Sequence, residues 1–172
     1  MLVSAGGSAT GLQILKTAIA ARPLSSLNNL RWRILFSPSI DVSQFRELER
    51  LAGEWITVER NRPDFSGLVK RARLSISQAG YNTITDILNS DTAAVVIPYA
   101  EADEVEQTLR AEILQRCGRL IVLHQADLSA AALASAIEQA CTFNVPLEVD
   151  LAGAANSVVL ISQWLDNARV RN

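Results

Sequence analysis

The sequence predicts an α/β domain in which about six parallel strands form a central sheet between two layers of helices. Short apolar runs alternate along the 172 residues with segments whose apolar positions recur every three or four residues. Uninterrupted apolar runs are typical of buried parallel strands, and parallel strands need crossover helices between them. Since this alternation continues along most of the chain, we expect one domain with helices on both faces of its sheet.

Each predicted strand is a short apolar run between polar or glycine-containing segments. The clearest is "AAVVIP" at 93–98, which contains no polar side chain, as expected for a strand buried on both faces. We expect strands at 2–4, 31–37, 55–59, 73–77, 93–98 and 119–124.

The segments between the strands have helical periodicity. Leu12, Leu15 and Ile19 mark one face of a helix over 11–22. Further helices are expected around 45–52, 65–72, 84–88, 105–113 and 133–141, with a last one from about 157. Polar residues suited to capping stand at three of the helix starts, namely Asp64, Asn82, and Asp103 with Glu106 as a capping box.

Residues 1–172 are predicted to form a single domain. Its core spans about 2–141, and 142–172 form a linker and a C-terminal helix. The stretch "TFNVPLEVDLAGAAN" at 142–156 is the one that resembles a linker.

Composition excludes several classes of protein. A net charge of −2 and a pI near 5.4 argue against a general nucleic-acid binder, whose surface is basic. The chain has no apolar run long enough to cross a bilayer and no signal-peptide pattern. Cys117 and Cys141 make no disulfide framework, and no Cys/His cluster has zinc spacing. We therefore expect a cytoplasmic protein with no transmembrane segment, no nucleic-acid partner and no metal site.

Parallel sheets of this kind bind ligands at the carboxyl ends of their strands, which directs attention to the loops that follow each strand. The first loop, "SAGGSATG", is neither a spaced dinucleotide motif nor a P-loop. Gly6 and Gly7 would let a ligand approach the backbone, and Ser8 opens a helix whose N-terminus favours an anion. Two interpretations remain open at this point, a phosphate cradle or a tight turn with Ser8 as the N-cap.

Two later loops have comparable features. Gly80 follows the fourth strand, and Asp86 in the next helix could accept hydrogen bonds from a diol such as ribose. Glu106 and Gln107 follow the fifth strand and offer acceptors and a donor suited to sugar hydroxyls. An acid-rich helix start, favoured by the helix dipole in any protein, is the alternative for both loops.

Four segments, in this order, resemble one family: "VSAGGSATG", "VERNRPDF", "ISQAGYNTITDIL" and "VVIPYAEADEVEQTLRAEIL". They are similar to the C-terminal, donor-binding half of glycosyltransferases with two facing Rossmann-like domains (the GT-B fold), and most similar to glycosyltransferase family 28. The similarity covers about residues 2–140. It implies a Rossmann-like three-layer sandwich that binds a nucleotide sugar, expected to be a UDP-sugar, and needs no other cofactor.

The resemblance also implies a role for each matching position. It assigns the diphosphate to Gly6, Gly7, Ser8, Gly80, Asn82 and Thr83, the base to the loop at Arg62, the ribose to Asp86, and the donor sugar to Glu106 and Gln107. Asp86 has a shorter side chain than the Glu that the family often has at this position. At the position of Glu106 and Gln107, the peptidoglycan branch of the family has a pair that resembles Gln-Gln. The sugar's identity therefore stays open.

The implied reaction is displacement of a nucleoside diphosphate from a sugar's anomeric carbon by an acceptor hydroxyl. The chain has no Asp-x-Asp metal motif, so a helix N-terminus is expected to stabilise the leaving group instead. The acceptor site and general base would lie on an N-terminal domain absent from this chain, through which any peripheral membrane contact would be made.

The family enters its first strand from a linker, whereas only Met1 precedes Leu-Val-Ser here. We expect either an excised C-terminal domain or a natural half that works with a partner chain. On both expectations the chain alone binds nucleotide and transfers no sugar. Two alternatives remain: half of a nucleotide-sugar 2-epimerase, with Asp103, Glu106 and His124 as its acid/base candidates, or a non-catalytic nucleotide-binding subunit.

Overall fold

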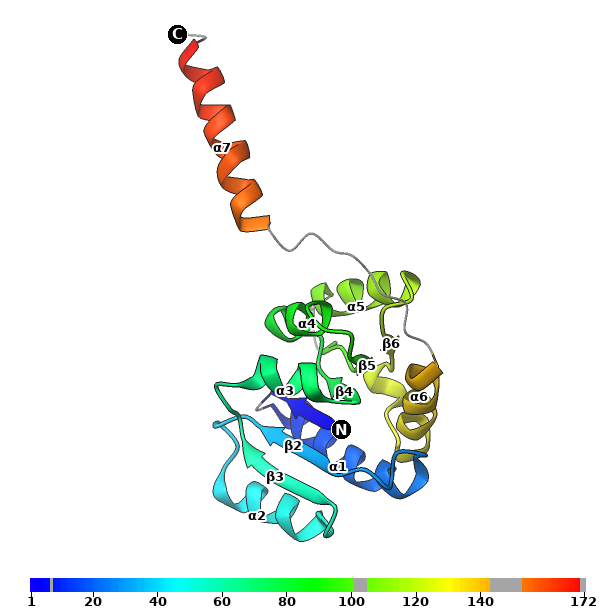
Figure 1. Ribbon diagram of the computed structural model, residues 1–172. Helices are drawn as coiled ribbons and strands as arrows, with labels where there is room; N and C mark the ends of the chain where they lie inside the picture. The colour runs from blue at the N-terminus through cyan, green and yellow to red at the C-terminus, as the bar shows by residue number, and fades with distance from the viewer. Residues whose placement is uncertain (7, 101–104, 143–152, 171–172) are drawn as a thin grey trace.

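A computed structural model of the chain, which describes residues 1–6, 8–100, 105–142 and 153–170, contains the expected parallel sheet (Figure 1). All of its six strands run parallel, in the order β3-β2-β1-β4-β5-β6. This is the order of a Rossmann fold, in which the strand sequence reverses between β1 and β4. The strands are β1 (Leu2–Ala5), β2 (Trp32–Phe36), β3 (Ile56–Arg60), β4 (Leu74–Ser77), β5 (Ala93–Val96) and β6 (Ile121–Val122).

The sixth strand is much shorter than the 119–124 run predicted. Only Ile121 and Val122 are in register with β5. The amide of Arg119 donates to the carbonyl of Leu114 at the end of the preceding helix, and that of Val122 donates to Gln115 Oε1. The Arg119 bond shows that the chain still closes the helix at a position predicted to be in the strand, so the apolar run alone overestimated the strand at its start.

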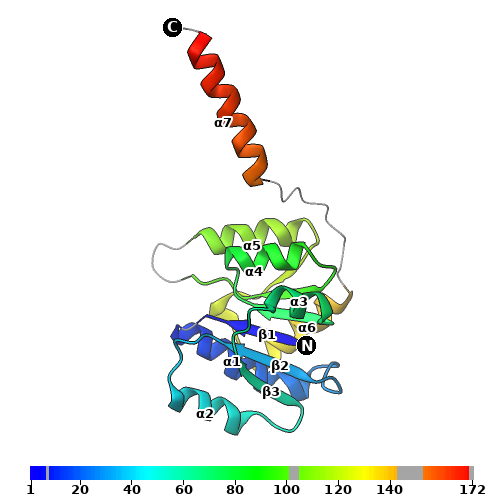
Figure 2. The same ribbon diagram turned by 60° about the vertical axis from the view of Figure 1, so that its left-hand side comes forward.

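Helices cover both faces of the sheet, which confirms the three-layer prediction (Figure 2). Alternate strand residues pack to opposite sides, so that Val3 and Ile34 join one core cluster while Leu2 and Leu35 join the other. The first cluster includes residues of α1 (Ala9–Ala21), α2 (Val42–Leu51) and α6 (Ala130–Thr142). The second includes residues of α3 (Phe65–Arg71), α4 (Tyr81–Leu88) and α5 (Glu106–Arg116).

Two of the predicted caps differ from the structure. Asn82 does not cap α4, because the helix begins at Tyr81 and Gly80 occupies the N-cap position. Asp64 does occupy the N-cap of α3 but makes no capping bond, since its carboxylate bonds to Arg62 instead. Because glycine has no side chain, the N-terminus of α4 has no side-chain cap.

The capping box predicted for α5 is also wrong. The helix begins at Glu106, after Val105 in the N-cap position, so Glu106 is its first residue rather than its third. Asp103 lies outside the described residues. A capping box is instead present in α2, between Asp41 and Gln44.

The last helix, α7 (Gly153–Val170), starts four residues before the predicted position and lies apart from the sheet in Figure 1. Val158, Leu160, Ile161 and Trp164 on it are exposed. Most of the predicted linker at 142–156 lies outside the described residues. None of the described helices is both long and apolar enough to cross a membrane. Two short 3-10 turns, η1 (Arg22–Leu24) and η2 (Gln125–Asp127), complete the described elements.

Candidate functional site

A pocket of about 390 Å³ lies at the carboxyl ends of β1, β2, β3 and β4. This is where strand order reverses, the position at which open α/β sheets bind ligands. The pocket brings together residues that are far apart in sequence. Of the predicted site residues it is lined by Gly6, Gly80, Asn82, Thr83, Asp86 and Gln107. Ser8, Arg62 and Glu106 do not line it.

The first loop is held by a side chain that the sequence analysis did not single out. The amide of Gly6 donates to Oε1 of Gln78, at 2.8 Å, across the edge of the sheet. Gln78 itself lines the pocket. Ser8 is the N-cap of α1, where its hydroxyl accepts from the Gly11 amide at 3.2 Å. Gly7 lies outside the described residues. The capping interpretation of Ser8 is therefore correct, and Gly6 contributes the pocket wall.

The start of α4 forms the wall opposite. Gly80, Asn82 and Thr83 line the pocket at an N-terminus that no side chain caps. The first N–H groups of such a helix lack intrahelical acceptors, so they and the dipole favour an anion. Asp86, half-buried one turn further on, forms no hydrogen bond or ion pair with any described residue. Its carboxylate is thus an acceptor with no donor among the described residues, and it lies in the same pocket as this helix N-terminus.

Only one member of the predicted sugar-binding pair lies in the pocket. Gln107 lines it, and its Oε1 accepts from the amide of Tyr99 at 3.3 Å, which leaves its side-chain N–H groups as donors. The Glu106 side chain is 74% exposed and forms an ion pair with Arg110. The two residues are adjacent on a helix, so their side chains differ by about 100° in direction.

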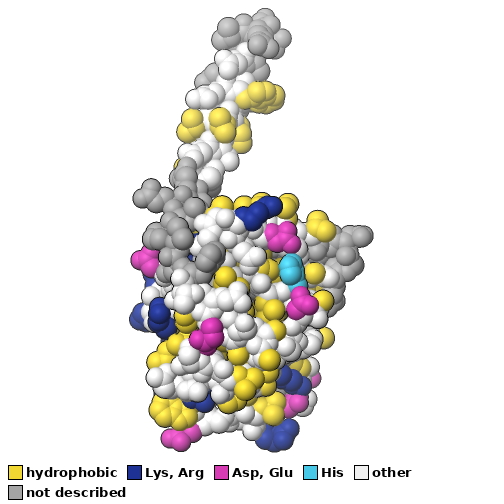
Figure 3. Space-filling model, turned by 90° about the vertical axis from the view of Figure 1, so that its right-hand side faces the viewer, with side chains coloured by type: hydrophobic (Ala, Val, Ile, Leu, Met, Phe, Trp, Pro, Cys, Tyr) yellow, Lys and Arg dark blue, Asp and Glu magenta, His cyan; other side chains and the backbone are white. Residues whose placement is uncertain are grey.

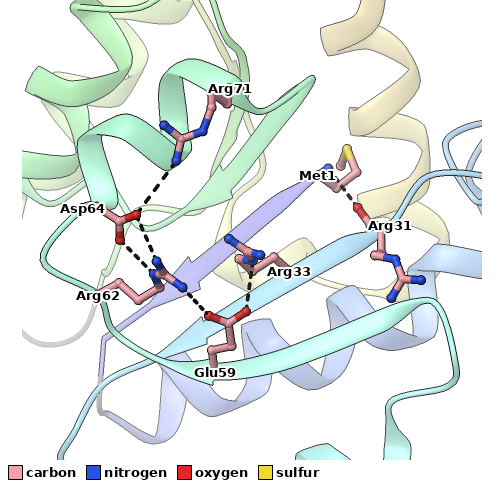
Figure 4. Close-up of polar contacts among 7 residues, drawn as sticks. All are labelled: Met1, Arg31, Arg33, Glu59, Arg62, Asp64 and Arg71. Atoms are coloured by element: carbon pink, nitrogen blue, oxygen red, sulfur yellow. Dashed lines mark hydrogen bonds and ion pairs between the residues drawn. The ribbon is translucent and has the colours of Figure 1, made fainter.

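Arg62 belongs to an ion-pair network rather than to the pocket (Figure 4). Its guanidinium donates to both oxygens of Asp64, at 2.8 and 3.1 Å, and lies 3.3 Å from Glu59. The bonds to Asp64 raise the pKa of Arg62 above its ordinary value. Glu59 also pairs with Arg33 at 3.1 Å. The neighbouring residue Asn61 lines the pocket instead, so this loop reaches the pocket through Asn61 and not through Arg62.

This network has a testable pH dependence. Chiefly through its bond to Arg62, the pKa of the Asp64 carboxyl lies below its ordinary value of 3.8. Folding therefore favours the carboxylate, and the stability it contributes is present above that value and lost as the pH falls below it. Replacing Asp64 with Asn should lower the melting temperature slightly at neutral pH and leave it unchanged at about pH 2. A constant difference across this range, measured by circular dichroism, would contradict the assignment.

The two described residues proposed for an epimerase, His124 and Glu106, lie outside the pocket. The side chain of His124 is 48% exposed and lies 3.9 Å from Glu112 on the surface, where Figure 3 shows the histidine. It lines a separate pocket beyond β6. Glu106 pairs with Arg110, and Asp103 lies outside the described residues. Among the residues that the structure describes, no group of three His, Cys, Asp or Glu side chains could hold a metal ion.

Sequence analysis missed six polar or aromatic lining residues: Ser4, Phe36, Ser37, Asn61, Phe65 and Gln78. Ser37, Asn61 and Gln78 directly follow β2, β3 and β4. Their position immediately after a strand was the available signal.

Comparison with known proteins points to one family. Residues 1–160 match the model of the glycosyltransferase family 28 C-terminal domain. A UDP-N-acetylglucosamine–N-acetylmuramyl-(pentapeptide) pyrophosphoryl-undecaprenol N-acetylglucosamine transferase of Gloeothece citriformis is 36% identical over 66 residues, which are 38% of this chain and 18% of that protein. The enzyme of the same name from Bartonella tribocorum is 29% identical over 118 residues, 69% of this chain and 31% of that protein.

Solved structures agree at the level of the fold. MurG of Acinetobacter baumannii matches 80% of this chain and 40% of its own, with a TM-score of 0.63 and 20% identity. The glycosyltransferase VinC, solved with dTDP, matches 81% of this chain and 33% of its own, with a TM-score of 0.62 and 14% identity. The chain thus spans less than half of each of these proteins. Together with the match over 1–160, the fold shows that the chain belongs to the glycosyltransferase family 28 C-terminal domain family.

Proposed function

We propose that the pocket binds the nucleoside diphosphate of a nucleotide sugar, and that the chain is the donor-binding half of a glycosyltransferase that transfers a hexose. One observation carries this proposal: the unpaired carboxylate of Asp86 lies in the same pocket as the uncapped N-terminus of α4. A helix N-terminus suits a phosphate, and a carboxylate one turn away suits the ribose diol.

The diphosphate is assigned to the space between the two strand-to-helix loops. On one side the N–H groups at the start of α4, from Gly80 to Thr83, are available as donors. On the other side Gly6 lines the pocket, with its own amide already bonded to Gln78. The Gln78 side-chain N–H groups have no bond to a described residue, so this residue offers donors in place of the Gly6 amide. Gly7 and Ser8 remain predictions for this role.

The base is assigned to the loop after β3. Asn61 lines the pocket there and offers an amide, and the ring of Phe65 on the first turn of α3 offers an apolar surface. Arg62 would act indirectly, because its pairing with Asp64 and Glu59 holds the loop in place. UDP is proposed as the nucleotide because the relatives' name contains UDP-N-acetylglucosamine.

In the proposed reaction an acceptor hydroxyl attacks the anomeric carbon as the bond from that carbon to the diphosphate breaks. Negative charge develops on the leaving diphosphate, where the N-terminus of α4 would stabilise it without a metal ion. Gln107 would orient the donor sugar. The base that takes the hydroxyl proton, and the acceptor site, are assigned to an N-terminal domain or a partner chain. The fragment alone is proposed to be inactive.

The direct test is a titration of the isotopically labelled chain with UDP, GDP, TDP and UDP-N-acetylglucosamine, followed by NMR. The proposal predicts amide shift changes at Gly6, Asn61, Gly80–Asp86 and Gln107. Affinity unchanged by EDTA is expected if no metal ion takes part. Binding with shifts confined to the amino edge of the sheet, or no binding by any of the four nucleotides, would refute it.

Asp86→Ala is expected to weaken UDP binding about 5- to 30-fold, or roughly 1–2 kcal/mol, because the ribose would lose a charged hydrogen-bond acceptor. Calorimetric titration measures this loss. Asp127→Ala removes the same group from the same edge of the sheet but outside the pocket, and should leave the affinity unchanged. Equal affinities for the two variants would remove the ribose assignment.

A further inference from the structure

We propose that Arg110 is a positioning residue that holds the α4 and α5 sides of the donor pocket, a role that rests on the proposed function. Sequence analysis gave no reason to select it, since it lies within helix α5 and not in a loop that follows a strand. Its side chain is only 20% exposed, whereas that of its partner Glu106 is 74% exposed. Such low exposure of an arginine side chain on an outer helix indicates that it makes specific contacts.

Three contacts hold the guanidinium. Its Nη1 donates to the carbonyl oxygen of Ala79 at 2.9 Å. Its Nη2 donates to Oε1 of Glu106, one turn earlier on α5. Its central carbon lies 5.5 Å from the centre of the Tyr81 ring, within range of a cation–π contact. Arg110 therefore joins the start of α4 to the start of α5, which are separated by more than twenty residues in the chain.

The bond to Ala79 affects the phosphate side of the pocket. The carbonyl of Ala79 and the amide of Gly80 belong to one planar peptide group. By fixing the direction of the carbonyl, Arg110 also fixes the direction of the Gly80 N–H, which points the opposite way. Gly80 lines the pocket at the uncapped end of α4, so the amide that would meet the diphosphate is oriented by a side chain from α5.

The bond to Glu106 affects the sugar side. One carboxylate oxygen is occupied by Arg110, and the charge of Glu106 is neutralised. The pair fixes the first turn of α5, from which Gln107 enters the pocket. Arg110 thus couples the two subsites. Binding of a nucleoside diphosphate would depend only on the bond to Ala79, whereas binding of a nucleotide sugar would depend on the bonds to Ala79 and Glu106.

The coupling can be tested first without ligand. Glu106→Gln should shift the amide resonance of Gly80 in the otherwise unchanged chain, since Arg110 transmits the change. In an Arg110→Met background the same substitution should leave Gly80 unmoved. Arg116→Met, at the exposed end of the same helix, is the matched control and should preserve the effect. A Gly80 response that persists without Arg110 would overturn the proposal.

The second test compares UDP with UDP-N-acetylglucosamine. Arg110→Met should weaken the nucleotide sugar about tenfold and UDP only about threefold, so that the ratio of the two affinities changes. Arg110→Lys should not restore the ratio, because one ammonium cannot reproduce the planar fork. Glu106→Gln combined with Arg110→Met should cost no more than Arg110→Met alone. A merely structural role would lower melting temperature without changing the ratio.

The outcomes separate the two proposals. If the wild-type chain binds neither nucleotide, the proposed function is wrong and the positioning role is wrong with it. If the wild-type chain binds both and Arg110→Met weakens them equally, the proposed function stands and only the positioning role is refuted.

Discussion

Gly11→Ala is expected to lower the free energy of unfolding by about 2–3 kcal/mol, as overpacking against backbone does, and to abolish tight nucleotide binding. A Cβ at this position would lie 1.9 Å from the carbonyl oxygen of Gly6 and 2.9 Å from its carbonyl carbon. Both atoms are backbone, so no rotamer change relieves the clash. Helix α1 or the loop before it must move, which would break the bond from Gly6 to Gln78.

The direction of this result is the opposite of the ordinary one, because alanine inside a helix is usually more stable than glycine by about 1 kcal/mol. Gly67→Ala is the matched control, since Gly67 lies in α3 and its added Cβ would meet only the flexible end of Arg71. Urea denaturation and UDP titration of both variants provide the comparison. If Gly11→Ala were as stable as Gly67→Ala and bound UDP undiminished, the close packing described for this loop would be incorrect.

Arg119→Met is expected to destabilise the domain by about 3 kcal/mol, which corresponds to a fall of roughly 6–12 °C in melting temperature. Arg119 is 2% exposed, and its guanidinium donates to the carbonyl oxygens of Ile87, Ser90 and Thr92. It thereby satisfies the C-terminal end of α4 and the turn into β5. Burial lowers the pKa of Arg119, which the carboxylate of Asp91 opposes.

Methionine keeps much of the apolar stem of Arg119 but removes the guanidinium donors from all three carbonyls, of which that of Ile87 also accepts from the amide and hydroxyl of Ser90. The loss should therefore come from hydrogen bonding rather than packing. Arg119→Lys should recover only part of the lost stability, because an ammonium group cannot span three acceptors in a plane. Arg116→Met, at an exposed position, should change stability by less than about 0.5 kcal/mol. Similar thermal unfolding of the Arg116 and Arg119 variants would contradict the structural role.

The order of the elements was predictable because it follows from short-range patterns. The run at 93–98 is typical of a buried strand, and the spacing of Leu12, Leu15 and Ile19 is that of one helix face. Element ends were less predictable. Asn82, a good capping residue, is the second residue of the helix, and Gly80 occupies the N-cap position.

Within the site, sequence identified the loops more reliably than the residues. Arg62 was selected for the base, yet Asn61 is the residue that lines the pocket. Glu106 and Gln107 were selected together, yet only Gln107 reaches it. In both cases a nearby opposite charge, Asp64 or Arg110, holds the charged side chain elsewhere. A charged side chain is a good candidate for binding a ligand because of its charge. The same charge lets it form an ion pair with a neighbouring residue, which holds it away from the pocket.

By itself the sequence determined the sheet, its crossovers and the edge at which a ligand pocket would form, because periodicity and turn residues act over a few positions. Only the tertiary structure decided which groups face that pocket. The bond from Gly6 to Gln78 joins residues 72 apart, and Arg110 bonds to Ala79 across 31. Such pairings depend on which loops the parallel strands bring to one edge of the sheet. No local sequence pattern encodes which of two adjacent side chains in such a loop faces the pocket.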